Sequence, residues 1–255
     1  MKKNILIIGG TGFLGYHLSK FFKKGYFVTS LSKNRPQRRR RLKKIKYIYA
    51  DISKQKELKI LNKKKFHYVI NCGGYVDHVN KQLTYKNHYL GCKNLINLLK
   101  NTDLKLFIQI GSSSEYGATR SPQSETTLGK AKTIYGKSKL AASKFLMSSK
   151  NNTFPFVILR FYQLFGPNQD SNRFIPFVIK SCLEDKKFPC SKCTQDRDFL
   201  YIDDAIKAVS KCLENLKNVK GKIINVGYGK PINLKKIINY ITKKIGKGTP
   251  NYGEI

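Results

Sequence analysis

The chain of 255 residues has room for one large α/β domain, or for a Rossmann-type domain with a small companion. Hydrophobic residues make up 40% of it and aromatic residues 12%, which excludes a disordered chain, and the lack of any run of about 18 apolar residues excludes a transmembrane helix. A net charge of +35 at pH 7 is typical of a protein with a polyanionic partner, or of a lysine-rich composition over solvated faces. The lysines are spread along the whole chain, which favours the second explanation.

The first residues look like the start of a signal peptide, but the apolar stretch Ile5–Ile8 is too short for one and runs into glycines. We therefore predict a buried strand there and a cytoplasmic protein. In such a protein free thiols are expected at the six cysteines, which are Cys72, Cys92, Cys182, Cys190, Cys193 and Cys212. The Cys190 and Cys193 pair has no second pair of ligands at zinc-site spacing, so no metal is predicted.

Short apolar runs alternate with longer helical patterns along the chain. In chain order we predict the strand Ile5–Ile8, the helix Leu14–Lys24 ended by Gly25, the strands Phe27–Leu31, Ile45–Tyr49 and Tyr68–Asn71, a helix containing Leu95–Leu99, the strand Leu106–Ile110, the helix Tyr135–Met147, the strand Phe156–Leu159, the helix Ala205–Leu213, the strand Lys222–Val226 and the helix Leu234–Ile245. This alternation is typical of βαβ units. The predicted fold class is α/β, a Rossmann-type doubly wound parallel sheet.

A glycine-rich loop follows the first predicted strand and opens the first helix. Glycines there let the backbone approach a pyrophosphate, and the helix N-terminus supplies N–H donors. We predict a dinucleotide cofactor on this loop; a purely structural turn is the alternative. The predicted contacts are Gly9, Thr11, Gly12, Phe13, Leu14 and Gly15.

The end of the second strand indicates which dinucleotide binds. NAD sites usually carry an acidic residue there for the ribose hydroxyl, whereas this chain has Ser32, Lys33 and Arg35, which would attract a 2′-phosphate. We therefore predict NADP, with NAD as the alternative. The run Arg38–Arg41 either extends this positive field or forms a solvated loop. After the third strand, Asp51 with Ile52 is placed to meet the adenine, or Asp51 caps the following segment.

Tyr135 and Lys139 are four residues apart and share one face of a predicted helix. An ammonium beside a phenol stabilises the phenolate, so such a tyrosine can exchange a proton with a carbinol oxygen during hydride transfer. A serine at the end of the strand upstream could bind the same oxygen. The spacing therefore predicts oxidoreductase chemistry.

Five segments in this order resemble the extended short-chain dehydrogenase/reductases, the NAD-dependent epimerase/dehydratase group that acts on nucleotide sugars. They are Gly9–Gly15, Ser112–Gly117, Tyr135–Lys139, Arg160–Pro167 and Arg197–Asp204, and the resemblance covers nearly the whole chain. It implies that Ser112, Tyr135 and Lys139 match the Ser/Thr-Tyr-Lys triad of the family, with Ser112 four residues before Tyr116. Tyr135 and Lys139 are also expected to contact the cofactor.

The resemblance also implies a substrate site and a domain division. Arg197 matches the arginine that binds the diphosphate, or forms a surface ion pair with Asp196 or Asp198, while Ser113, Gln163 and Asn172 are expected near the sugar. The NADP-binding domain is predicted to hold residues 1–165 and 198–226. Residues 166–197 and 227–255 are predicted to form a small, C-terminally truncated substrate-binding subdomain. A homodimer is expected through helices near Leu90–Leu99 and Leu140–Met147.

Two departures from the family pattern bear on the reaction. Ser113 and Ser114 stand where dehydratases carry Asp-Glu, so 4,6-dehydration is not expected. His88 stands near the usual asparagine, or Asn87 replaces it by a shift; His88 is then a proton relay or a structural polar residue.

The segments Ser112–Gly117 and Phe161–Pro167 are also similar to the CDP-abequose or CDP-paratose synthase-like reductases of O-antigen synthesis. We therefore predict a 4-keto reductase acting at C4 of a nucleotide-activated sugar. A 4-epimerase with retained NAD is the alternative within the family. A polyanion- or RNA-binding protein, or an inactive dinucleotide-binding one, is the alternative of another class, and nucleic acid is the less favoured partner.

Overall fold

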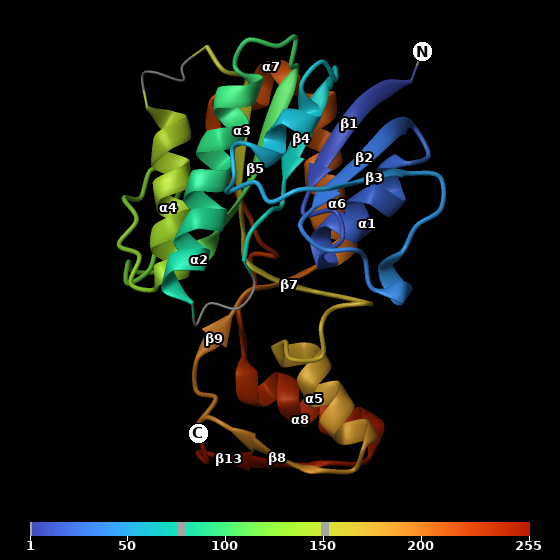
Figure 1. The fold of residues 1–255 in the computed structure, drawn as a ribbon. Coiled ribbons are helices and arrows are strands. Elements are labelled where there is room, and N and C mark those ends of the chain that lie inside the picture. The colour runs from blue at the N-terminus through green and yellow to red at the C-terminus, as the bar shows by residue number, and fades with distance from the viewer. Residues whose placement is uncertain (1, 76–79, 149–152) are drawn as a thin grey trace. The chain divides into compact units, whose positions relative to one another are not determined.

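A computed structural model describes residues 2–75, 80–148 and 153–255. The chain forms two compact units, one of Met1–Phe161 with Asp203–Val226 and the other of Tyr162–Ile202 with Gly227–Ile255 (Figure 1). The chain therefore passes between units after residues 161, 202 and 226, where the sequence placed the divisions after 165, 197 and 226. The cofactor- and substrate-binding roles of the units stay predictions.

The first unit contains a seven-stranded sheet of the order β11-β6-β5-β4-β1-β2-β3, in which every neighbouring pair is parallel. Its strands are β1 (Lys3–Ile8), β2 (Tyr26–Ser32), β3 (Lys46–Tyr49), β4 (Tyr68–Asn71), β5 (Leu106–Ser112), β6 (Phe156–Phe161) and β11 (Lys222–Val226). The predicted Rossmann-type fold class is confirmed. Each strand of the first unit lies on a predicted apolar run, because strands covered on both faces read as continuous apolar stretches.

Helices cover both faces of this sheet, with α3 and α4 on one face and α1 and α6 on the other (Figure 1). The helices of the unit are α1 (Phe13–Phe22), α2 (Lys81–Tyr85), the π-helical turn Lys86–Leu90, α3 (Gly91–Leu99), α4 (Ile134–Met147), α6 (Ile202–Glu214) and α7 (Leu216–Val219). The core under α3 and α4 includes Leu95, Ile96 and Leu146, which pack with Phe107 and Ile158 of the sheet. This packing holds α3 and α4 against one face of the sheet.

The second unit is built from short strand pairs and two helices. β7 (Gln163–Phe165) pairs with β10 (Phe199–Tyr201), β8 (Lys187–Cys190) with β13 (Thr249–Tyr252), and β9 (Asp196–Arg197) with β12 (Ile232–Asn233). The helix α5 (Phe174–Leu183) packs on α8 (Leu234–Ile245) around a small core. Of these elements only α8 was predicted from the sequence. The strands of two to four residues show no readable period, and the ten-residue helix α5 was also missed.

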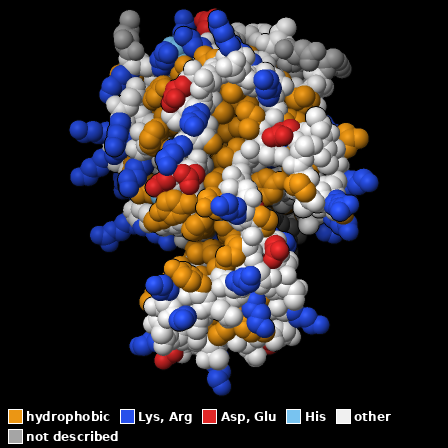
Figure 2. Space-filling view, turned by 180° about the vertical axis from the view of Figure 1, so that it is seen from behind, with side chains coloured by type: hydrophobic (Ala, Val, Ile, Leu, Met, Phe, Trp, Pro, Cys, Tyr) orange, Lys and Arg blue, Asp and Glu red, His pale blue; other side chains and the backbone are white. Residues whose placement is uncertain are grey.

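Lysine and arginine side chains are scattered over the face of the molecule that Figure 2 shows, instead of gathering in one patch. This distribution supports a lysine-rich composition over solvated faces as the source of the net charge. Within the described ranges, no helix is both long and apolar enough to pass through a bilayer.

Candidate active site

The strand order of the sheet reverses around β1, since β2 and β3 lie on one side of it and β4 to β6 on the other. Ligands of doubly wound sheets bind at such a point, outside the carboxyl ends of the strands. A cavity of about 220 Å³ lies there. It is lined by Ile8, Gly9, Thr11, Gly12, Leu31, Ser32, Lys33, Asn34, Ala50, Asp51, Ile52, Cys72, Gly73, Gly74 and Asn87.

The glycine-rich loop approaches this cavity with its backbone. The first turn of α1 packs so closely on the loop that a Cβ on Gly15 would clash with the carbonyl oxygen of Gly9. The N-cap of α1 is Gly12, which has no side chain to bind the free N–H groups of the first turn, and that turn carries no acidic residue. The N-terminal amides of α1 can therefore serve an anion, so the loop fits the pyrophosphate of a dinucleotide. Phe13 and Leu14 lie in the first turn of α1 and outside the cavity lining.

Asp51 caps the turn that follows β3 and also lines the cavity, while its contact with the adenine stays a prediction. Its Oδ1 accepts hydrogen bonds from the backbone N–H and the hydroxyl of Ser53, and its Oδ2 lies 3.4 Å from the Nζ of Lys33. Burial alone would raise the pKa of Asp51, but the Ser53 hydrogen bonds and the Lys33 charge outweigh it and lower that pKa. Asp51 is therefore held as a carboxylate beside the predicted adenosine site.

Of the other cofactor residues predicted at the end of β2, Ser32 and Lys33 line the cavity and Arg35 does not. The Ser32 hydroxyl accepts a hydrogen bond from the backbone N–H of Thr11. Arg35 is exposed, with its guanidinium 5.9 Å from the ring centre of Tyr49, and it is not part of the lining. Asp51 is the one acidic side chain in the lining, and it pairs with Lys33, the one lysine or arginine there.

The four arginines of the run Arg38–Arg41 differ in exposure. Arg38, Arg39 and Arg41 are exposed, while Arg40, at the end of a 3₁₀ turn, is buried. Three of the four thus belong to a solvated loop.

Tyr135 and Lys139 lie one turn apart near the start of α4, where the Thr133 hydroxyl caps the helix by accepting from the Gly136 N–H. Lys139 is buried, and its Nζ donates a 2.7 Å hydrogen bond to the backbone carbonyl of Ile110 on β5. The same Nζ lies 5.9 Å from the ring centre of Tyr135. Lys139 therefore connects the tyrosine to the strand that carries Ser112.

Ser112 is the last residue of β5, two positions after the carbonyl that binds Lys139. Its Oγ accepts a hydrogen bond from the backbone N–H of Ser114 at 3.1 Å. Because that contact uses a lone pair, the hydroxyl proton stays available to a substrate oxygen. The elements that carry Ser112, Tyr135 and Lys139 thus meet in one unit, at the carboxyl end of β5.

His88 lies against Tyr135. The two rings are edge to face with their centres 5.0 Å apart, and the His88 Nε2 is 3.3 Å from the backbone carbonyl of Tyr75. The imidazole is buried and fills the space that a side chain at Gly74 would need. It sits on the π-helical turn Lys86–Leu90, a distortion that often occurs at functional sites. These contacts support the interpretation of His88 as a structural polar residue; a relay role stays a prediction.

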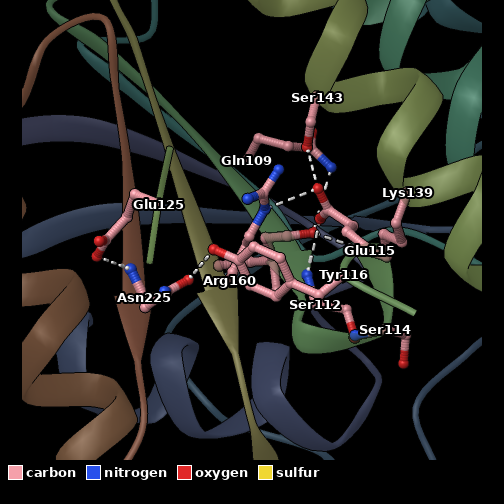
Figure 3. A network of polar contacts seen from close by, with 11 residues as sticks. Gln109, Ser112, Ser114, Glu115, Tyr116, Glu125, Lys139, Ser143, Arg160 and Asn225 are labelled. Carbon is pink, nitrogen blue, oxygen red and sulfur yellow. Dashed lines mark hydrogen bonds and ion pairs between the residues drawn. The ribbon is translucent and has the colours of Figure 1, made fainter. Parts of the chain in front are cut away.

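A buried polar network behind Ser112 was missed by sequence reasoning (Figure 3). Glu115 is fully buried, and its Oε2 lies 2.9 Å from the Nε of Arg160, a residue that is 3% exposed. The Tyr116 hydroxyl donates to the side chain of Asn225, whose backbone N–H donates to Glu125. One readable signal was present, because Ser112 and Glu115 have the Ser-x-x-Glu spacing of a capping box.

The predicted substrate residues divide between the units. Ser113 begins a 3₁₀ turn in the first unit, whereas Gln163, Asn172 and Arg197 are exposed residues of the second. The Gln163 backbone N–H donates to the Asp198 carbonyl. Arg197 donates from Nη1 to the backbone carbonyl of Asp196 at 2.8 Å. This contact uses a peptide oxygen, and the guanidinium remains exposed for an anionic ligand.

All six cysteines are free, and five are buried. Cys190 and Cys193 belong to the hydrophobic core of the second unit, and burial raises the pKa of Cys190 to about 11. The described residues hold no group of three or more His, Cys, Asp or Glu side chains able to bind a metal ion.

The thiols of the first unit are expected to resist alkylation. Burial raises the pKa of Cys72 and Cys92 to about 12, so the thiolate is scarce at pH 8. Iodoacetamide should modify both at least about 100-fold more slowly than the same cysteines in unfolded protein, which follows from the thiolate fraction. Peptide mass spectrometry over time measures this, with urea-denatured protein as the control. Labelling of native Cys72 at the denatured rate would contradict the expectation.

Comparison with known proteins identifies the family. The sequence matches the NAD dependent epimerase/dehydratase family over residues 5–227. The chain belongs to this family. The resemblance inferred from the five segments is thereby confirmed, and members of this family are NAD-dependent enzymes on nucleotide sugars.

Individual members differ in the reaction that their names give. The chain is 27% identical to the CDP-abequose synthase of Salmonella muenchen, over 100% of this chain and 85% of that protein. It is 28% identical to the dTDP-D-glucose 4,6-dehydratase of Dictyostelium discoideum, over 93% of this chain and 62% of that one. A solved structure of the UDP-glucuronic acid 4-epimerase of Bacillus cereus, with UDP-glucuronic acid and NAD, is 29% identical with a TM-score of 0.87 and covers 98% of this chain and 85% of that chain.

Proposed function

We propose that this protein is an NADPH-dependent 4-keto reductase of a nucleotide-activated hexose. The observation that carries the proposal is that the Nζ of Lys139 binds the Ile110 carbonyl, two residues before Ser112 on β5, and lies 5.9 Å from the ring centre of Tyr135. The similarity to CDP-abequose synthase over the whole chain supports a reductase. Ser113 and Ser114, in place of an acid pair, disfavour dehydration.

The three side chains divide the chemistry at the C4 oxygen. Bound NADPH supplies the hydride. The Tyr135 phenol donates a proton to the C4 oxygen as negative charge develops there, and the ammonium of Lys139 stabilises the phenolate that remains. The Ser112 hydroxyl donates a hydrogen bond to the same oxygen, which lowers the energy of the developing alkoxide.

In this proposal the second unit supplies substrate recognition. The exposed guanidinium of Arg197 would bind the diphosphate of the nucleotide sugar, because a planar cation suits phosphate oxygens. Gln163 and Asn172 would contact the sugar. The family resemblance supports these assignments.

Preference for NADPH is proposed from the positive charges at the end of β2. In Lys33→Gln/Arg35→Gln, the Kd for NADPH is expected to rise about 10- to 100-fold, since each charged contact to a phosphate contributes roughly 1 kcal/mol or more. The Kd for NADH should stay within about twofold, because no 2′-phosphate is present. Fluorescence titration of both dinucleotides measures the change.

Arg38→Gln/Arg39→Gln is the matched control, because it removes two exposed charges from the neighbouring turn. Its effect on the two dinucleotides should be small and equal. If Lys33→Gln/Arg35→Gln weakened both dinucleotides equally, the proposed recognition of a 2′-phosphate would be wrong.

A nucleotide-sugar 4-epimerase is the second candidate, favoured by the 29% identical epimerase structure with bound NAD. The two functions differ in stoichiometry. A reductase consumes one NADPH for each 4-ketohexose, whereas an epimerase interconverts C4 isomers with no net change in cofactor. Titration with NADPH and NADH, followed by a screen of 4-keto nucleotide sugars for NADPH consumption, separates them. Interconversion of C4 epimers with retained NAD would overturn the reductase proposal.

A further inference from the structure

We propose that Glu115 is a positioning residue that sets the Ser112 hydroxyl relative to Tyr135 and Lys139. The inference rests on the catalytic roles proposed above for those three residues. It adds a residue that touches neither substrate nor cofactor and acts through the backbone of Ser112.

One carboxylate joins the elements that carry the reactive groups. Its Oε1 accepts a hydrogen bond from the backbone N–H of Ser112 at 2.9 Å, at the end of β5. Its Oε2 accepts from the hydroxyl of Ser143 at 2.7 Å, one turn after Lys139 on α4. Figure 3 shows these contacts converging on the Glu115 side chain. Because β5 carries Ser112 and α4 carries Tyr135 and Lys139, Glu115 fixes the two elements to each other.

The charge of this carboxylate is balanced from β6. The Arg160 Nε lies 2.9 Å from Oε2, and the guanidinium also lies over the ring of Tyr116, 4.5 Å from its centre. Burial lowers the pKa of Arg160, but the charges and hydrogen bonds of Glu115 and Tyr116 together outweigh burial, so the pKa of Arg160 is raised. The Arg160 guanidinium therefore stays charged beside Glu115, and the contacts with Arg160, Ser112 and Ser143 fix the position of the carboxylate.

The backbone around Ser112 is shaped for this contact. Gly111 leaves room for the carboxylate, because a Cβ there would lie 2.7 Å from Oε1. The Ser112 side chain and the Glu115 side chain cap the same 3₁₀ turn reciprocally. Without the Glu115 oxygen as acceptor for the Ser112 N–H, the end of β5 would no longer be held in place. The Ser112 hydroxyl would then no longer point in a fixed direction.

Two variants separate the position of the carboxylate from its charge. Glu115→Gln keeps an oxygen for the Ser112 N–H but removes the charge opposite Arg160. The exchange Glu115→Ser/Ser143→Glu keeps one buried carboxylate for Arg160 but leaves Ser112 N–H without its acceptor. If Glu115 served only to form the ion pair with Arg160, the exchange variant would have wild-type stability and activity, whereas Glu115→Gln would not.

The positioning role predicts the opposite pattern in turnover. In the exchange variant, kcat should fall about 10- to 100-fold with little change in KM, as expected when a reactive group is misplaced by about 1 Å. The melting temperature should fall by only a few degrees, because the ion pair is kept and only the Ser112 N–H loses its acceptor. Glu115→Gln should lose stability but keep kcat within about threefold, because the Ser112 contact survives. Wild-type kcat in the exchange variant, or an equal loss in both, would overturn the proposal.

Amide hydrogen exchange of Ser112, read by NMR, supplies a measurement that does not depend on turnover. Faster exchange at Ser112 in the exchange variant than in Glu115→Gln supports positioning, and equal rates overturn it. Wild-type protein that reduces none of the 4-keto sugars would refute the proposed function. The Ser112 exchange rates would then still decide the role of Glu115.

Discussion

Replacement of Tyr135 by Phe is expected to lower kcat by about 10²- to 10⁴-fold, the range for loss of a general acid. The change removes one oxygen and leaves the ring, so the edge-to-face contact with His88 and the proximity to Lys139 survive. NADPH should bind as it does to the wild type, because the glycine-rich loop and the charges after β2 are untouched. Single-turnover kinetics with a 4-keto nucleotide sugar and fluorescence titration with NADPH measure the two effects.

Tyr85→Phe is the matched control for Tyr135→Phe. Tyr85 is 40% exposed on α2 and has no role in the proposed chemistry, so its variant should turn over at the wild-type rate. Full activity in Tyr135→Phe would refute the proton-transfer role. A parallel loss of NADPH binding would show instead that the ring is needed to build the cofactor site.

Replacement of Arg160 by Met is expected to destabilise the first unit by about 3–5 kcal/mol, the range for breaking a buried ion pair at one partner. The variant leaves the Glu115 carboxylate buried opposite an apolar side chain, with Ser112 N–H and Ser143 as its remaining donors. Urea denaturation followed by circular dichroism gives the change in the free energy of unfolding. A fall in melting temperature of roughly 10 °C should accompany it.

Lys207→Met provides the control for the buried pair. Lys207 and Asp204 form an ion pair at 3.0 Å on α6, but both side chains are largely exposed, at 71% and 50%. Solvent screens such a pair, so its loss should have a far smaller effect. Equal losses in the two variants would mean that the Arg160–Glu115 pair contributes no more than a surface contact.

The fold of the first unit could be predicted because its strands read directly in sequence. Phe156–Leu159 is continuously apolar, so a strand was predicted there. The observed strand extends through Arg160 to Phe161; the prediction stopped before Arg160 because that residue is charged, although its side chain is buried against Glu115. The second unit could not be predicted in the same way. Asp196–Arg197 is a strand because it pairs with Ile232–Asn233, and this pairing between distant segments leaves no local signal.

In the candidate site, too, the residues in local sequence patterns could be predicted and the contacts made by packing could not. Loop glycines and the spacing of Tyr135 and Lys139 are local patterns, so sequence alone proposed them. The bond from Lys139 to the Ile110 carbonyl depends on how α4 packs on β5, and only the structure places it. Cys72 and Gly73 line the cavity because β4 ends beside β1, which the chain order does not reveal.

The discontinuity of the first unit has a consequence for synthesis of the protein on the ribosome. β6 pairs with β5 on one side and with β11 on the other, but residues 162–221 lie between β6 and β11 in the chain. At ordinary elongation rates, β6 therefore emerges on the order of seconds before its second partner is made. During that interval the edge of a six-residue strand, apolar except for Arg160, is open to pairing with another nascent chain. Chaperone dependence and aggregation on rapid expression should therefore centre on Phe156–Phe161.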